Sequence, residues 1–173
     1  MDAVALAAVI DEAAKKSGLL WLRVPGPGQR AQPVWHVWQD GVGYVLSGGI
    51  EQPVPDGLDD LAFVTLRSKD KGSRLVTFEA RVSVVSPEDE QWSAVEPALL
   101  AKRLNLPDGE AAPQRWRREC TLFRLEPTGE VAETPDDPST SAHAAPPPPS
   151  PARTRVPRPL HFRGRPRHNK GGR

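Results

Sequence analysis

Residues 33–48 read PVWHVWQDGVGYVLSG, two runs of apolar and aromatic residues joined by Asp40 and Gly41. An Asp-Gly pair between alternating hydrophobic runs is a strong β-hairpin signal, because both residues tolerate the positive φ that the turn requires. The stretch therefore predicts one strand over 33–39, a two-residue turn, and a second strand over 42–47.

Apolar spacing on both sides of this hairpin predicts further strands and two helices. Residues 3–14 carry apolar side chains at three- and four-residue spacing, which is typical of an amphipathic helix. The connections between the predicted strands are too short for repeated crossover helices. We therefore expect a mainly β (α+β) fold, an antiparallel barrel of six strands with flanking helices. The other strands are expected over 19–24, 61–67, 74–85 and 119–125, and the second helix is expected to start at Ser86 and Pro87.

Charge and proline content divide the chain into two parts. Eight of the 23 cations follow Asp137, where there is no acid, so residues 1–137 carry 15 cations and 22 acids, a net charge of −7. Half of the 20 prolines lie between Pro135 and Pro166, with almost no large apolar residue to offset the entropy cost of ordering. We expect an acidic folded domain over 1–127 and a disordered basic tail over 128–173.

The single cysteine and the short apolar runs bear on where the protein is located. Cys120 alone cannot form an intrachain disulfide, which agrees with a reducing compartment. The first 18 residues lack the basic start and apolar run of a secretory signal. No apolar stretch approaches the roughly 18 to 20 residues that span a bilayer. The expected location is the cytoplasm, without a membrane anchor.

The densest aromatic cluster is Trp35-His36-Val37-Trp38, on the first hairpin strand. Alternation puts His36 and Trp38 on one face and Trp35 and Val37 on the other, and we expect one face to be partly exposed. Aromatic rings beside a cleft can stack on a planar ligand, and an imidazole can exchange protons near neutral pH. The alternative is that both tryptophans are core residues and His36 is a hydrogen-bonded sheet residue. Trp21 is expected in the core.

Four cations surround the predicted turn between the strands over 61–67 and 74–85. Residues 67–74 read RSKDKGSR, so Arg67 and Arg74 flank this turn. Guanidinium groups, hydroxyls and free turn amides are the groups that bind a phosphate. An ordinary solvated hairpin tip has a similar composition. The chain has no Walker motif and no dinucleotide glycine fingerprint, which argues against the common nucleotide-binding folds.

Other charged segments have both a functional and a structural interpretation. Arg115-Trp116-Arg117-Arg118 could bind an anion by stacking and charge, or it is the polar edge leading into the last strand. The basic tail could contact nucleic acid or an acidic partner weakly, in a salt-sensitive way, or it is a solubilising tail. The histidine, cysteine and acid spacings indicate neither a metal site nor a covalent nucleophile.

In the order and patterning of these elements, residues 3–127 resemble the flavin-binding split-barrel family typified by pyridoxamine 5'-phosphate oxidase. The matching segments are GLLWLRV (18–24), the hairpin over 33–48 and AFVTLRSKDKGSRLVTFEARVSVVSP (62–87), followed by a helix and a closing strand. The resemblance implies a six-stranded split β-barrel and a homodimer that binds flavin mononucleotide (FMN) at the subunit interface. It also implies an oxidoreductase that acts by hydride transfer on a small substrate.

Carried over by position, the resemblance places the flavin ring along the hairpin. It makes His36 the candidate catalytic proton donor. The candidate cofactor contacts on the hairpin are Trp38, Tyr44, Ser47 and Gly48. The candidate phosphate ligands, inferred from charge and hydroxyl groups, are Arg67, Ser68, Lys69 and Arg74.

The sequence departs from the family at two positions, which keeps other cofactors open. The best-known members have a Lys or Arg near the end of the second strand and a basic pair just after the third. This chain has Trp38 and Ser47-Gly48-Gly49-Ile50-Glu51 there. Relatives that bind a deazaflavin or haem, or no cofactor, stay open as alternatives. A noncatalytic adaptor whose tail binds nucleic acid or an acidic partner is the alternative of another class.

Overall fold

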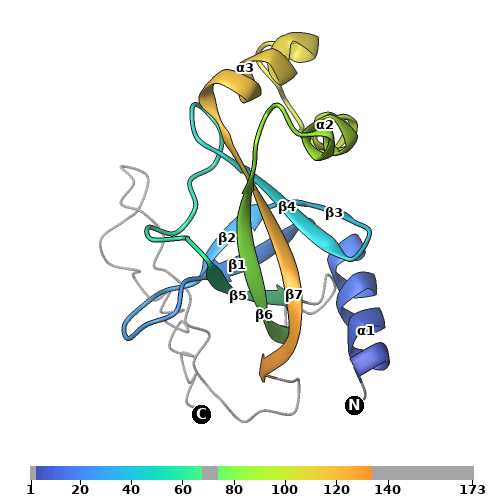
Figure 1. Ribbon diagram of the computed structural model, residues 1–173, viewed down its shortest axis with the longest axis vertical. Coiled ribbons are helices and arrows are strands. Elements are labelled where there is room, and N and C mark those ends of the chain that lie inside the picture. The colour runs from blue at the N-terminus through green and yellow to red at the C-terminus, as the bar shows by residue number, and fades with distance from the viewer. Residues whose placement is uncertain (1–2, 68–73, 134–173) are drawn as a thin grey trace, which may run out of the picture.

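The hairpin belongs to a curled, seven-stranded antiparallel sheet in the computed structural model of the chain (Figure 1). The structure describes residues 3–67 and 74–133, without the side chains of Ala3, Arg74 and Glu133. The strands are β1 (Leu19–Arg23), β2 (Gln32–Trp35), β3 (Val37–Gln39), β4 (Val42–Ser47), β5 (Leu61–Arg67), β6 (Arg74–Val85) and β7 (Thr121–Glu133). The helices are α1 (Ala3–Lys16), α2 (Glu90–Lys102), the short 3-10 helix η1 (Gly109–Ala111) and α3 (Ala112–Glu119).

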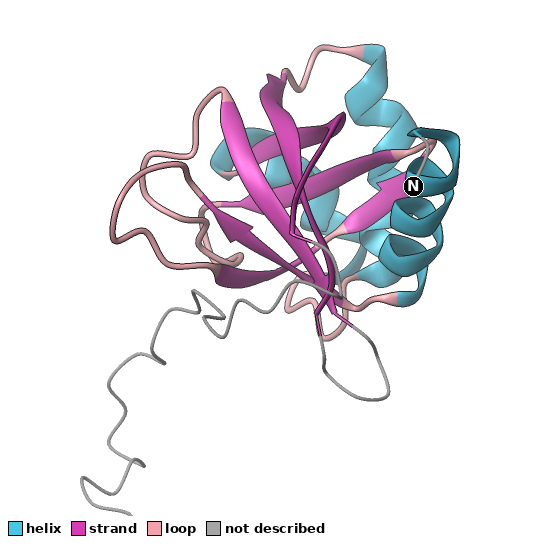
Figure 2. Cartoon of the chain, turned by 90° about the horizontal axis from the view of Figure 1, so that it is seen from below, coloured by secondary structure: helices cyan, strands magenta, loops and turns pink. Residues whose placement is uncertain are grey.

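The strand predicted over 33–39 is two strands at opposite edges of the sheet. The strand order is β2-β1-β5-β6-β7-β4-β3, and only His36 separates β2 from β3 along the chain. Because consecutive segments occupy both edges, the sheet must curl until these edges approach each other, and the strands cross one another in the second view (Figure 2). The fold is mainly β as expected, with seven strands rather than six.

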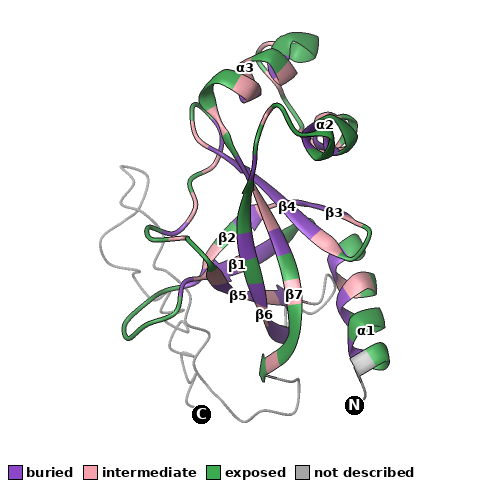
Figure 3. Ribbon diagram, in the orientation of Figure 1, coloured by how far each residue is buried: buried purple, intermediate pink, exposed green. Residues whose placement is uncertain are grey.

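One apolar cluster fills the inside of the curled sheet. Alternate residues of β1, β5 and β6 point inward, and Leu20, Val64 and Phe78 have at most 1% of their surface exposed. Helix α1 packs on the same cluster with Leu6 and Ile10, which are four residues apart and so share one face. Figure 3 shows buried residues (purple) along the strands and exposed residues (green) on the outer side of α1.

A second apolar cluster joins helices α2 and α3 to strands β3, β4 and β7. Trp92 on α2 and Trp116 on α3 are buried in it, together with Leu46 and Leu122 from the sheet. These two helices form a lobe at one end of the molecule, away from α1 (Figure 1). The molecule therefore has two packed regions, which we call the barrel core and the helical lobe.

The helical lobe differs from the prediction in two ways. Two helices were predicted, over 3–14 and from Ser86, but the segment before the last strand contains a further helix, α3, with Pro113 in its first turn, a position that suits proline. Helix α2 begins at Glu90, later than the predicted start at Ser86. The backbone N–H of Ser86 donates to the Asp89 carboxylate at 3.0 Å, and this turn precedes the helix.

The last strand is longer than predicted. β7 runs to Glu133, past the expected end of the domain at Pro127. The basic tail after Glu133 lies outside the described residues, as do Ser68 and Lys69. Within the two described ranges, no helix combines the length and the apolar character needed to cross a membrane.

Candidate binding face on the outside of the barrel

The outward side of β1, β5 and β6 is a partly exposed surface that carries aromatic and cationic side chains. Strand pairing aligns Trp21 with Thr65 and Thr65 with Thr77, and it aligns Arg23 with Phe63 and Phe63 with Glu79. Residues at paired positions point to the same side of a sheet. We call this surface the outer face, and it consists of Trp21, Arg23, Phe63, Thr65, Arg67, Thr77 and Glu79.

Two guanidinium groups lie over aromatic rings on the outer face. The Cζ atom of Arg67 is 4.4 Å from the ring centroid of Trp21, and the Cζ atom of Arg23 is 4.4 Å from that of Phe63. Both distances are within the range of a cation–π contact. Trp21 was expected in the core, but strand alternation puts Leu20 and Leu22 there and leaves Trp21 half-buried on the outside.

The Arg67 guanidinium has a hydrogen-bond donor that the described residues leave unsatisfied. Its Nε atom is shielded from solvent and has no hydrogen-bond partner in the described part of the chain. Next to this pair, the hydroxyls of Thr65 and Thr77 hydrogen-bond each other at 2.8 Å. A cation with an unused donor beside an indole ring and hydroxyl groups can bind an anionic group attached to a flat ring.

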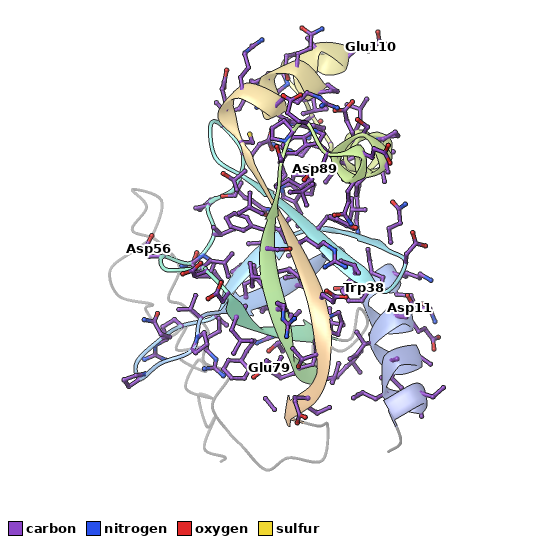
Figure 4. All side chains as sticks on the ribbon, in the orientation of Figure 1. Asp11, Trp38, Asp56, Glu79, Asp89 and Glu110 are labelled. Atoms are coloured by element: carbon purple, nitrogen blue, oxygen red, sulfur yellow. The ribbon has the colours of Figure 1, made fainter. Side chains whose placement is uncertain are left out.

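His36 and Trp38 are both buried, and the partly exposed residue of the Trp35-His36-Val37-Trp38 segment is Trp35, on the other predicted face. His36 has no exposed surface, and its Nε2 is 3.1 Å from the Ala14 carbonyl oxygen of α1. Burial, with the nearby charge of Lys102, lowers the pKa of His36 to about 4. The indole Nε1 of Trp38 donates to Asp11 of α1 at 3.0 Å. Both residues are labelled in Figure 4, between the hairpin and α1.

The other predicted hairpin contacts lie against the helical lobe. The Gln91 side chain of α2 donates to the buried Tyr44 hydroxyl at 2.9 Å, and Ser47 is also buried. Gly48 has φ 107°, and a Cβ there would be 2.9 Å from the Glu119 carbonyl oxygen, so only glycine fits. Of the predicted site residues whose side chains the structure describes, Arg67 alone is on the outer face. The cofactor roles of the others stay predictions.

A buried ion-pair network in the helical lobe has no counterpart in the predicted site. The Glu51 carboxylate, which is fully buried, accepts hydrogen bonds from Arg103 at 2.7 Å, Arg115 at 3.0 Å and the Trp116 indole at 2.9 Å. Burial would raise the pKa of Glu51, but these hydrogen bonds outweigh it and hold the pKa below its usual range. Arg115 also pairs with Asp108 at 2.8 Å.

The network is structural rather than a free anion site. It connects the loop after β4 to the end of α2 and to α3, and its cations are already paired with carboxylates. Arg117, also predicted as an anion ligand, pairs with Glu96 of α2 at 2.7 Å. Sequence patterns could not identify the network because Glu51 and Arg115 are 64 residues apart. No group of three or more metal-ligating side chains occurs within residues 3–67 and 74–133.

Comparison with known proteins identifies the fold. The crystal structure of Rv2991 from Mycobacterium tuberculosis matches with a TM-score of 0.51 and 16% identity over 74% of this chain and 81% of the other. HutZ, the haem storage protein of Vibrio cholerae, matches with 0.50 and 17% over 68% and 87%. A candidate pyridoxamine 5'-phosphate oxidase from Listeria innocua matches with 0.50 and 13% over 73% and 98%.

These similarities establish the fold class. No protein-family model matches the sequence, and no curated protein matches it. The chain has the split β-barrel fold of the pyridoxamine 5'-phosphate oxidase-like proteins, as its sequence pattern predicted. Because the identities are low, no residue role is transferred from these structures.

Proposed function

We propose that this protein binds a flavin, FMN or a deazaflavin, on the outer face of the barrel and acts as an oxidoreductase on a small substrate. The observation that carries the proposal is the Arg67 guanidinium, stacked on the half-buried Trp21 ring with its Nε donor unpaired. The split-barrel fold supports it, since one protein with this fold is a candidate pyridoxamine 5'-phosphate oxidase.

The residues of the outer face fit the two parts of such a cofactor. The anionic phosphate would bind Arg67, whose planar guanidinium suits phosphate oxygens. Arg74 on β6 is the strand-pairing partner of Arg67 on β5. The ring system would lie beside the Arg67–Trp21 and Arg23–Phe63 pairs, which together offer planar cationic and aromatic surface. The partly exposed Thr65 hydroxyl, which is 2.8 Å from the hydroxyl of the buried Thr77, would lie between these parts.

The chemistry divides between the cofactor and the chain. When bound, a flavin supplies hydride transfer at its ring. The chain's own residues hold the phosphate with Arg67, orient the ring against Trp21 and exclude water from one side of it. We assign no proton transfer to His36, because its ring is buried under α1 with a pKa of about 4.

The described residues fit haem less well than a flavin. HutZ is a haem storage protein with the same fold, so haem binding is compatible with a split barrel. An iron ligand must be able to reach the metal, and imidazole is the most common nitrogen ligand. In the described part of the chain the one histidine is His36, which is fully buried.

We further propose that two copies of the chain cover the outer face together. Trp21 and Phe63 are only partly buried in one copy, and aromatic and arginine side chains are typical of interface cores. A second copy would remove water from the bound ring and complete the groove. This agrees with the homodimer that the sequence resemblance implies.

The direct test is an absorption spectrum of the purified full-length protein, followed by a fluorescence titration with FMN. We expect flavin bands, or quenching of added FMN, in the native protein. Arg67→Gln should weaken FMN binding by about tenfold or more, because a charge-assisted hydrogen bond contributes about 1.5–3 kcal/mol. The matched control is Arg118→Gln, an exposed arginine of α3, which should bind like the native protein. A colourless protein that binds neither FMN nor a deazaflavin would contradict the proposal. A purified protein whose spectrum shows the Soret band of haem would also contradict it.

A further inference from the structure

The pairing of β6 with β7 contains a large irregularity. Ala80 pairs with Pro127 and Phe78 pairs with Val131. The segment 78–80 of β6 therefore lies opposite the longer segment 127–131 of β7. The extra residues form a bulge that contains Gly129 at φ 92°, a backbone conformation that glycine adopts readily. Bulges of this kind turn side chains away from the regular sheet and often lie beside binding sites.

Thr128 holds the bulge in place. Its Oγ1 is 3.2 Å from both the backbone carbonyl and a carboxylate oxygen of Glu79, and it accepts a hydrogen bond from the Glu130 N–H at 3.3 Å. Glu79 belongs to the outer face and lies near the lower ends of β6 and β7 in Figure 4. The bulge is therefore ordered and adjoins the outer face.

A cavity of about 230 Å³ lies at this bulge, lined by Arg81, Glu126, Pro127 and Thr128. Arg81 is two residues after Glu79 on β6, so its side chain is on the same side of the sheet as the outer face. The cavity is smaller than the roughly 300–1,000 Å³ of sites for drug-sized ligands, which restricts it to a small molecule.

The lining of the cavity includes one cationic side chain, Arg81, and one anionic side chain, Glu126. Arg81 is exposed and is the cross-strand partner of Glu126, whose pKa is lowered mainly by Arg124 and also by the charge of Arg81. No hydrogen bond or ion pair within residues 3–67 and 74–133 occupies the Arg81 guanidinium. Glu126 pairs with Arg124 at 2.7 Å through Oε2, and the second carboxylate oxygen can accept another hydrogen bond. An unpaired guanidinium fork and a carboxylate thus face the same small space.

We propose that this cavity binds a small zwitterion such as an α-amino acid, with its carboxylate on Arg81 and its ammonium on Glu126. A guanidinium fork matches a carboxylate in a bidentate geometry. The Glu126 carboxylate would repel a simple dianion, whereas it attracts an ammonium group next to the carboxylate. The role of this molecule as a substrate rests on the proposed function, since the cavity adjoins the face assigned to the flavin.

The test uses full-length ¹⁵N-labelled protein without added flavin, titrated with L-alanine, propionate and ethylamine. The last two compounds each lack one charged group of alanine. We expect alanine to bind most tightly, with amide shifts at Arg81, Glu126 and Thr128. Arg81→Gln should weaken alanine binding by about tenfold or more, and the Arg118→Gln control should not.

Two results would overturn the proposal. One is alanine binding that is unchanged in Arg81→Gln or that shifts amides elsewhere. The other is propionate binding as tightly as alanine, which would mean that the ammonium group is not recognised. Because no flavin is present, failure here is distinguishable from failure of the FMN titration.

Discussion

His36 sits where the chain passes from one edge of the sheet to the other, and its environment is apolar. Its Nε2 contacts the Ala14 carbonyl oxygen, and its Nδ1 has no partner in the described part of the chain. Gln52 supports the same crossing point from outside, because its side-chain amide bonds both the N–H of Trp35 at 2.7 Å and its carbonyl oxygen at 2.8 Å. A buried imidazole in this position is structural.

The buried imidazole makes stability depend on pH. Because the pKa of His36 is lowered to about 4 in the fold, the unfolded chain binds the proton more tightly. The contribution of the neutral His36 imidazole to the free energy of unfolding is therefore fully present above pH 6.5. It decreases by up to about 3 kcal/mol as the pH falls toward 4. Urea unfolding at pH 7 and pH 4.5 measures this loss. His36→Gln should lose less stability over the same interval, and an equal loss in both proteins would refute the assignment.

At the scale of elements, the sequence predicted strands better than helices. The strand predicted over 74–85 is β6, and its alternate residues Val76, Phe78, Ala80 and Val82 are buried. Alternation would put Val84 on the same buried side, but Val84 is 63% exposed, while Val85 joins the helical lobe. The side of β6 that is buried changes because its last residues leave the barrel core and contact a different set of helices.

The Glu51 network attaches the helical lobe to the sheet, so its loss should destabilise the domain. Glu51→Ala leaves Arg103 and Arg115 without their buried partner, and breaking such a pair costs about 3–5 kcal/mol. Glu12→Ala, which removes an exposed ion pair with Lys16, should cost much less, because solvent screens the two charges. Chemical denaturation of the two variants measures the difference. Similar costs would show that the network does not hold the lobe.

At the scale of the whole molecule, two separate packed regions share one continuous sheet. The barrel core lies between α1 and the curled strands, and the helical lobe packs on β3, β4 and β7. Neither helix of the lobe contributes to the outer face of β1, β5 and β6. The side of the barrel that we assign to the cofactor is therefore available to a second copy of the chain.

A homodimer through the outer face makes a specific prediction. Phe63 is half-buried there, so Phe63→Glu places a charge in the interface without disturbing the barrel core. We expect a native dimer and a monomeric Phe63→Glu variant in sedimentation velocity experiments. Leu104→Glu, at a leucine that is 73% exposed beside α2, should remain a dimer. A native monomer, or a Phe63→Glu dimer, would contradict this interface.

The sequence by itself determined which segments become strands, because alternation and the Asp40-Gly41 turn are local properties of the chain. It could not show that the strand breaks at His36, that Trp21 faces outward or that Glu51 meets Arg115. These features depend on how the sheet closes and where the helices pack. Only the tertiary structure decided them, since burial and pairing between distant residues are set by the curled sheet as a whole.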